Sequence, residues 1–181
     1  MSFTFTPCKI EGLYEILPNV YNDRRGNFFE SYSERDFYDA GITVRFVQDN
    51  QSRSCKGTLR GLHYQKQNPQ GKLIRVVEGE VFDVAVDMRC GSPTQGKWNG
   101  LILNSEKKNQ LYIPPGFAHG ILALTSQAIL AYKCTNFYHH EDEGGIIWND
   151  PTIGIQWPDI GMEYILSEKD RKLPFWEEIN K

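Results

Sequence analysis

The sequence lacks the features of a secreted, membrane-spanning or nucleic-acid-binding protein. Its four cysteines form no CxxC pair and lie far apart, which favours free thiols in a reducing cytoplasm over a disulfide framework. The first residues, MSFTFTPCKIEG, lack the basic region and apolar run of a signal peptide, and no apolar stretch approaches membrane-spanning length. With a net charge of -3, the chain lacks the excess of basic residues that is typical of polyanion-binding proteins. We therefore expect a cytoplasmic protein with neither a nucleic acid nor a membrane as its partner.

The chain contains one clear helix signal and many strand signals. Ser33 can cap a helix that Gly41 ends, and a second short helical piece is predicted near 167–172. Apolar and aromatic runs predict strands in five segments: 46–50, 59–65, 72–88 with a turn at Gly79, 110–124 with a break at Pro114, and 128–138. We expect a single domain over 1–181 that is mainly all-β, with a few short helices and an antiparallel core at roughly 45–140. The jelly-roll barrel of the cupin type is one such architecture.

The histidines do not form a recognisable metal motif. The segment PPGFAHG resembles the second cupin motif, in which a turn aims a histidine, here His119, into the barrel. The place of the first motif, which in metal-binding cupins reads His-x-His, is taken by His63, Tyr64 and Gln65, and Lys72 follows. A metal ion needs three or four converging ligands, and a lysine would repel it. We expect a metal-free cavity. The alternative is an unusual metal site that includes His63 and His119.

Without a metal, the residues favour proton abstraction next to a ketone. His63 can act as a base near neutral pH, with Asp170 as a candidate to orient its ring. The base alone cannot remove so weakly acidic a proton, and Lys72 is suited to stabilise the enolate oxygen. A tyrosine hydroxyl can return a proton from the opposite face, and Tyr132 and Tyr138 share a face if their strand stays extended. A base on one side and an acid on the other invert the carbon.

Several cations are candidates to bind an anion such as a diphosphate, although a lone surface cation is more often simply solvated. They are Arg25, Arg60, Lys72 and Lys169. Arg60 is the least easily explained as a surface residue, because it lies within an apolar strand run. His139 and His140, in the segment YHHEDE, are interpreted as part of a solvated turn.

An ordered set of motifs along nearly the whole chain resembles the dTDP-4-dehydrorhamnose 3,5-epimerase family of the dTDP-rhamnose pathway. The motifs are DRRGNFFES, FVQDN, LRGLHYQ, QGKL, GEVFDVAVDMR, IPPGFAHG, YKCTNFY, WNDP and LSEKD. The resemblance implies a cupin-like jelly roll without metal or cofactor, usually a homodimer. It also implies a substrate, dTDP-4-dehydro-6-deoxy-glucose, that is epimerised at carbons 3 and 5 on either side of its ketone.

The resemblance also assigns roles to residues. It implies that His63 is the base with Asp170 as its carboxylate partner, that Tyr132 is the general acid, and that Lys72 lies near the keto oxygen. The positions that match substrate-binding residues are Arg25, Phe28, Glu30, Gln48, Asn50, Arg60, His119, Tyr138, Glu143 and Lys169. Phe28 and Tyr138 are candidates to stack on thymine or sugar, and both could equally be packing residues.

Some alternatives stay open at this point. Strict alternation places Arg60 and His63 on opposite faces of a strand, so either a bulge at Gly61 turns one inward or Arg60 reaches the site from the barrel rim. Related sugar-nucleotide cupins epimerise only one carbon or move the ketone. Two alternatives belong to other functional classes: a non-catalytic sugar-binding cupin and a metal-dependent cupin enzyme.

Overall fold

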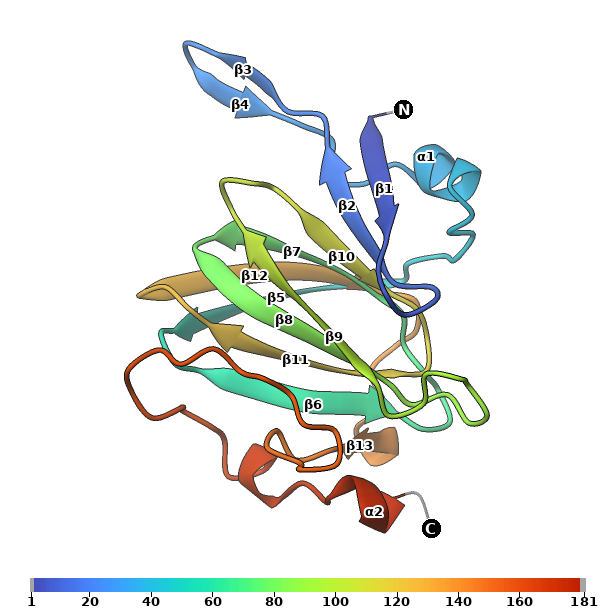
Figure 1. Cartoon of the computed structure of the whole chain (residues 1–181). Helices are drawn as coiled ribbons and strands as arrows, with labels where there is room; N and C mark the ends of the chain where they lie inside the picture. Colours follow the sequence, from blue (N-terminus) through green and yellow to red (C-terminus); the bar gives the residue numbers. More distant parts are fainter. Residues whose placement is uncertain (1, 180–181) are drawn as a thin grey trace.

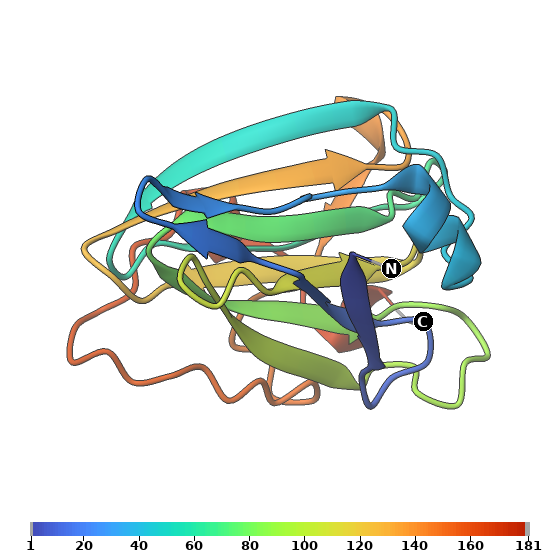
Figure 2. The same ribbon diagram turned by 90° about the horizontal axis from the view of Figure 1, so that it is seen from above.

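The computed structural model describes residues 2–179 and consists of two antiparallel sheets that face each other (Figures 1 and 2). The larger sheet has the strand order β1 (Phe3–Pro7), β2 (Tyr14–Pro18), β10 (Gln110–Ile113), β7 (Lys72–Glu78), β12 (Gln127–Cys134) and β5 (Gln48–Cys55). The smaller sheet has the order β13 (Glu143–Gly145), β6 (Leu59–Gln65), β11 (Phe117–Ala123), β8 (Glu80–Asp87) and β9 (Trp98–Asn104). The all-β, cupin-like jelly roll is confirmed, although the two sheets do not close into one hydrogen-bonded ring.

The remaining elements are short and lie outside these sheets. They are the strands β3 (Tyr21–Asp23) and β4 (Gly26–Phe28), the helices α1 (Glu34–Asp39) and α2 (Trp176–Ile179), and the 3-10 turns η1 (His140–Asp142) and η2 (Asp170–Lys172). Strands β3 and β4 form a hairpin that projects from the body of the protein (Figure 1). No helix within residues 2–179 is both long and apolar enough to cross a bilayer.

The predicted helix and most predicted strands are confirmed. The Ser33 hydroxyl accepts a hydrogen bond of 3.4 Å from the backbone N–H of Asp36, and Gly41 follows the end of α1 with a φ of +87°. The segment 59–65 coincides with β6, and the segment 72–88 divides into β7 and β8 at Gly79. The predicted short helical piece near 167–172 contains η2.

Two predicted strand boundaries were wrong. The strand predicted at 128–138 ends at Cys134, because the Thr135 hydroxyl accepts a hydrogen bond from Gly71 and Asn136 bonds to the backbone N–H of Phe137. These local bonds replace strand pairing with a bend. The strand predicted at 46–50 begins at Gln48 and runs further, to Cys55, along β12. The prediction of a single domain stays a prediction.

Strand β8 is covered on both faces, which fixes the direction of its alternate side chains. Val81 and Ala85 belong to the main core between the sheets, whereas Val84 and Val86 pack outward against the C-terminal segment that includes Trp157. The orange and red C-terminal segment lies below β6 in Figure 1 and covers this outer face. A polar residue at an even spacing from Val81 must therefore point between the two sheets.

Candidate active site

Two adjoining cavities, of about 320 and 290 Å³, lie between the sheets. Both are lined by His63, Lys72 and Tyr132, so these three side chains stand where the cavities meet. One cavity, the Tyr138 lobe, is also lined by Gln48, Asn50, Tyr64, Gln65, Gln70, Tyr138 and Glu143. The other, the His119 lobe, is also lined by Ser52, Arg60, His119, Ile121, Leu130, Ser167, Lys169 and Asp170. The structure therefore brings all four predicted catalytic residues around one cleft.

The His63 imidazole is held by a carboxylate from a distant part of the chain. Its Nε2 lies 2.6 Å from Oδ1 of Asp170, the first residue of η2. The backbone N–H of Asp170 donates a hydrogen bond of 3.0 Å to the Ser167 hydroxyl, which helps to fix the position of this residue. Burial opposes ionisation of Asp170, but the hydrogen bonds from His63, Ser167 and Gly61 outweigh it and lower the pKa of this carboxyl. An ionised Asp170 fixes the hydrogen on Nε2, which leaves the lone pair on Nδ1.

A bulge in β6 places Arg60 and His63 in the same cavity. His63 lies opposite His119 and Arg60 lies opposite Ile121, so two residues of β6 face the single Gly120 of β11. Gly61 has a φ of +122°, and a Cβ there would lie 2.6 Å from the Gly120 Cα atom. Only glycine suits this position. The open question of Arg60 is thus decided for the bulge, since Arg60 lines the His119 lobe.

Lys72 is the first residue of β7 and points into the cleft from the larger sheet. Its strand position is set by pairing with Cys134 of β12 and Ile113 of β10. Burial lowers the pKa of the Lys72 ammonium, while the neighbouring Cys134, Asp83 and Glu143 act against this shift. His63 enters from the smaller sheet, so a small molecule in the cleft can meet a base from one sheet and a cation from the other.

Tyr132, on β12, lies opposite Asn50 of β5 and reaches the cleft from the larger sheet. Burial raises the pKa of the Tyr132 hydroxyl, so the group stays protonated at neutral pH and can donate a proton. Tyr138 also lines the Tyr138 lobe, although not for the predicted reason, because β12 ends before it. The extended-strand argument was wrong, and a loop rather than a strand carries Tyr138 to the cleft.

A second histidine–carboxylate pair lies in the His119 lobe. The His119 Nε2 atom is 2.9 and 3.0 Å from the two carboxylate oxygens of Asp83, whose side chain is fully buried. Asp83 was not predicted as part of the site. The available signal was its spacing along β8, two residues from Val81 and two from Ala85, which places all three side chains on the same inward face. A carboxylate that points between the sheets requires a partner there.

The Tyr138 lobe is rich in hydrogen-bonding side chains. Gln48 donates a bond of 3.0 Å to the Asn50 side chain and accepts one of 3.0 Å from the Tyr138 backbone. The Tyr138 hydroxyl donates a bond of 2.8 Å to Glu143, which also forms an ion pair with Lys169. Burial opposes ionisation of Glu143, but these two partners outweigh it and lower its pKa. The predicted binding residues Gln48, Asn50, Tyr138, Glu143 and Lys169 thus border the cleft.

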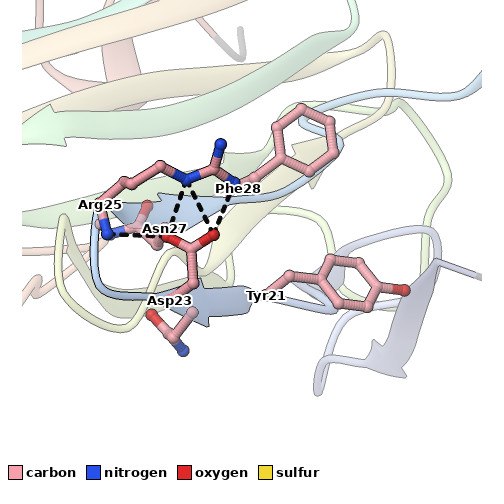
Figure 3. A pocket seen from close by; sticks show the side chains of 7 residues that line it. Tyr21, Asp23, Arg25, Asn27 and Phe28 are labelled. Atoms are coloured by element: carbon pink, nitrogen blue, oxygen red, sulfur yellow. Dashed lines mark hydrogen bonds and ion pairs between the residues drawn. The ribbon is translucent and has the colours of Figure 1, made fainter.

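Three predicted binding residues lie outside the cleft of their own chain. Arg25 and Phe28 belong to the β3–β4 hairpin, and Glu30 follows it, exposed. Figure 3 shows the Arg25 guanidinium folded back onto the Asp23 carboxylate, with a shortest distance of 2.6 Å, while Phe28 is 69% exposed. The hairpin encloses a hollow of about 530 Å³ that is lined by its own residues and shares none with either lobe.

Among residues 2–179, no group of three or more His, Cys, Asp or Glu side chains is arranged to hold a metal ion. His63 and His119 each lie next to a carboxylate, but these two pairs do not combine into such a group of possible metal ligands. The metal-free and cofactor-free cavity stays a prediction, which a chelator experiment can test.

Curated proteins of similar sequence carry one name. The family model described as dTDP-4-dehydrorhamnose 3,5-epimerase matches residues 7–178. A protein of that name from Methanothermobacter thermautotrophicus is 52% identical over 170 residues, which cover 93% of this chain and 92% of that protein. Another, from Pseudomonas aeruginosa, is 55% identical over 156 residues and covers 86% of each chain.

Solved structures agree with these sequence relationships. A dTDP-6-deoxy-D-glucose-3,5-epimerase from Legionella pneumophila, in complex with dTDP-4-keto-L-rhamnose, superposes with a TM-score of 0.95 and 50% identity, over 98% of this chain and 95% of that one. A 3'-monoepimerase from Streptomyces bikiniensis, in complex with dTDP-quinovose, superposes with a TM-score of 0.88 and 35% identity, over 93% and 86% of the two chains. The fold therefore hosts both double and single epimerisation.

Proposed function

The chain belongs to the dTDP-4-dehydrorhamnose 3,5-epimerase family, and from this premise we propose how its cleft performs the reaction. The protein is an isomerase of the dTDP-rhamnose pathway that epimerises carbons 3 and 5 of dTDP-4-dehydro-6-deoxy-glucose. Both carbons flank the ketone at carbon 4, so each proton can leave as an enolate forms. The roles of the individual residues, the dimer and the compartment are our proposals.

His63 removes the proton from carbon through its Nδ1 atom. The observation that carries this assignment is the 2.6 Å contact between Nε2 and Asp170, which leaves Nδ1 as the basic nitrogen. Asp170 orients the ring and stabilises the imidazolium that forms. Such a carbon acid is roughly a dozen pKa units weaker than imidazolium, a gap on the order of 16 kcal/mol. General-base catalysis supplies only about 10²–10⁴ in rate, so the developing oxyanion must be stabilised as well.

Lys72 stabilises the enolate oxygen, and Tyr132 returns the proton. The Lys72 ammonium lies in the cleft, where partial burial lowers its pKa, and a charge in such a low-dielectric place interacts strongly with an oxyanion. His63 projects from β6 and Tyr132 from β12, so the two side chains approach a sugar from opposite sheets. Proton removal on one face followed by proton delivery on the other inverts the carbon.

The nucleotide lies in the Tyr138 lobe, with Arg60, His119 and Lys169 available to the sugar and phosphates in the neighbouring lobe. We propose that the protein is a homodimer in which the hairpin of one chain completes the cleft of the other. The support is the position of Arg25 and Phe28, which are exposed on a projecting hairpin and line no lobe of their own chain. A two-fold dimer exchanges such arms reciprocally.

We also propose that the enzyme works in the cytoplasm. Its four cysteines are free thiols in the structure, and two of them, Cys55 and Cys90, are exposed. Exposed free thiols are compatible with a reducing compartment and are prone to oxidation outside it.

The function is tested by solvent exchange. In deuterium oxide, the enzyme should introduce deuterium at carbon 3 and at carbon 5 of dTDP-4-dehydro-6-deoxy-glucose, as followed by NMR. Addition of a chelator should leave the rate unchanged. Exchange at only one of the two carbons would instead favour a single epimerisation, as in the Streptomyces relative named above.

A further inference from the structure

His63 is connected to the protein surface by a row of three side chains. Its Nδ1 lies 3.9 Å from Oε1 of Glu143, the other oxygen of Glu143 accepts a bond of 2.8 Å from the Tyr138 hydroxyl, and that hydroxyl lies 3.2 Å from Nδ1 of the exposed His140. We propose that Glu143, Tyr138 and His140 form a proton path that regenerates His63 between the two epimerisations. This proposal rests on the proposed function, since it concerns the base of that reaction.

A double epimerisation makes such a path necessary. After the first inversion His63 is protonated and Tyr132 is deprotonated, so neither can act at the second carbon until both are reset. The two groups face opposite sides of the bound sugar, which blocks direct transfer between them. A nucleotide bound in the Tyr138 lobe, as proposed above, would also occupy the cavity that His63 lines and so limit its access to solvent. A route through the side chains that line this lobe avoids both obstacles.

The transfer can be written with every proton accounted for. The Nδ1–H bond of His63 breaks and an O–H bond forms on Glu143, whose carboxyl then turns about its terminal bond. The Tyr138 hydroxyl, no longer needed as a donor to the protonated Glu143, turns its hydrogen toward His140. Glu143 then passes its hydrogen to the Tyr138 oxygen as the original Tyr138 hydrogen moves to Nδ1 of His140. The His140 imidazolium releases its proton to water. Tyr132 regains one proton from solvent, so the enzyme returns to its starting state with no net gain or loss.

The distances and charges suit this role. The 3.9 Å separation exceeds a hydrogen bond, but catalytic hydrogen bonds are often long in a ligand-free enzyme and tighten in the complex. Glu143 is only 11% exposed and is held ionised by Lys169, so it is an acceptor when the imidazolium forms. A carboxyl of lowered pKa keeps a proton only briefly, which favours onward transfer to Tyr138.

The neighbouring histidine provides a matched control. His139 lies in the same loop, but its Nδ1 is 3.4 Å from Glu141, which has no contact with His63. His139, which is half-buried, and His140, which is exposed, are therefore neighbours in sequence, and within residues 2–179 the row of contacts to the base runs through His140. Neither residue lines either lobe.

The experiment compares His140→Gln with His139→Gln in dilute, poorly proton-carrying buffer. We expect kcat of the first variant to fall several-fold, with the singly epimerised sugar accumulating in NMR spectra, and kcat of the second to stay at the parental value. Added imidazole should restore His140→Gln by carrying protons in place of the missing ring. Tyr138→Phe, which keeps the aromatic ring and removes the hydroxyl, should show the same buffer-dependent loss.

Two outcomes would overturn the path. One is a parental kcat in both His140→Gln and Tyr138→Phe at low buffer concentration. The other is a loss that imidazole does not restore, since this would indicate a structural role for the loop. Failure of the proposed function is distinguishable from both, because the parental enzyme would then epimerise neither carbon in any buffer.

Discussion

The barrel interior and the β3–β4 hairpin differ in how complete they are within one chain. In the interior, His63 is bonded to Asp170 at 2.6 Å and His119 to the fully buried Asp83 at 2.9 Å. On the hairpin, Arg25 forms an ion pair with Asp23, two residues away, and the two side chains are 84% and 48% exposed. The proposed catalytic groups are therefore held in place within one chain, whereas part of the predicted nucleotide site lies on an exposed hairpin.

This difference follows from burial. A buried carboxylate must find a hydrogen-bond partner, and the two sheets hold each pair in a fixed register. An exposed ion pair contributes little to stability, so Arg25 can leave Asp23 for a phosphate at small cost. In the proposed function, the interior thus supplies a fixed geometry for the transition state, and the hairpin supplies a movable cation for binding.

The largest effect is expected from His63→Asn, which removes the base from the interior. Turnover should fall on the order of 10³-fold, because only the oxyanion stabilisation and binding remain. Affinity for dTDP, measured by calorimetry, should stay within a few-fold, since the proposed nucleotide contacts are made mainly by other side chains of the Tyr138 lobe. Unchanged turnover would leave only the reading of a non-catalytic sugar-binding protein.

Lys72→Met should lower kcat by about 10²–10³, as for the loss of an oxyanion donor. Methionine has a similar length, but it carries no charge. Because burial lowers the pKa of Lys72, the folded chain disfavours the charged form, and its removal should raise the midpoint of thermal unfolding. Assays and thermal melts on one preparation check both parts. A variant that is less stable and fully active would contradict the assigned role.

Arg25→Ala should act mainly on binding. Loss of a charge-assisted bond to a phosphate predicts a rise of roughly tenfold in KM, with a smaller change in kcat. A change confined to kcat would indicate that Arg25 acts in the catalytic step. The interior and the hairpin would then no longer differ in function. Asp23→Asn is the matched control, because it frees the guanidinium without removing it.

Mixing two defective chains tests whether the hairpin acts on the partner's cleft. One chain carries His63→Asn, and the other carries both Arg25→Ala and Phe28→Ala. Random exchange of subunits gives mixed dimers in which one cleft has both a base and an intact hairpin, so about a quarter of all sites should recover. If the hairpin served its own chain instead, no site would be complete and the mixture would stay inactive.

The sequence predicts the interior strands and site residues better than it predicts local departures from regular strand geometry. Alternation and turn residues locate β6, β7 and β8, and the motif resemblance identifies His63, Lys72 and Tyr132, which the structure brings to one cleft. Alternation could not place Arg60, because the bulge at Gly61 depends on close packing against Gly120. It also extended β12 past Cys134, since side-chain bonds to the backbone at Thr135 and Asn136 override strand propensity.

The smallest effect on activity is expected from Asp87→Asn, which tests how the interior is supported. Asp87 is fully buried and accepts bonds from Arg89 at 2.8 Å and from Ser92 and Thr94, each at 2.6 Å. It lies outside both lobes, so kcat should stay near the parental value. Loss of the ionised acceptor should lower the free energy of unfolding by about 2 kcal/mol at neutral pH.

The pH dependence of the stability of Asp87→Asn distinguishes a buried carboxylate of the barrel from the exposed Asp23 of the hairpin. Burial opposes ionisation of Asp87, but its bonds from Arg89, Ser92 and Thr94 outweigh this effect and lower its pKa. As the pH falls below 3.8, the ordinary pKa of an aspartate, the unfolded chain binds a proton at Asp87 that the folded chain does not. The free energy of unfolding therefore decreases as the pH is lowered through this range. Denaturant titrations across this range should show a flatter acid dependence in Asp87→Asn. Asp23→Asn should leave the slope almost unchanged, although Arg25 lowers the Asp23 pKa as well, because that pair is exposed and contributes little.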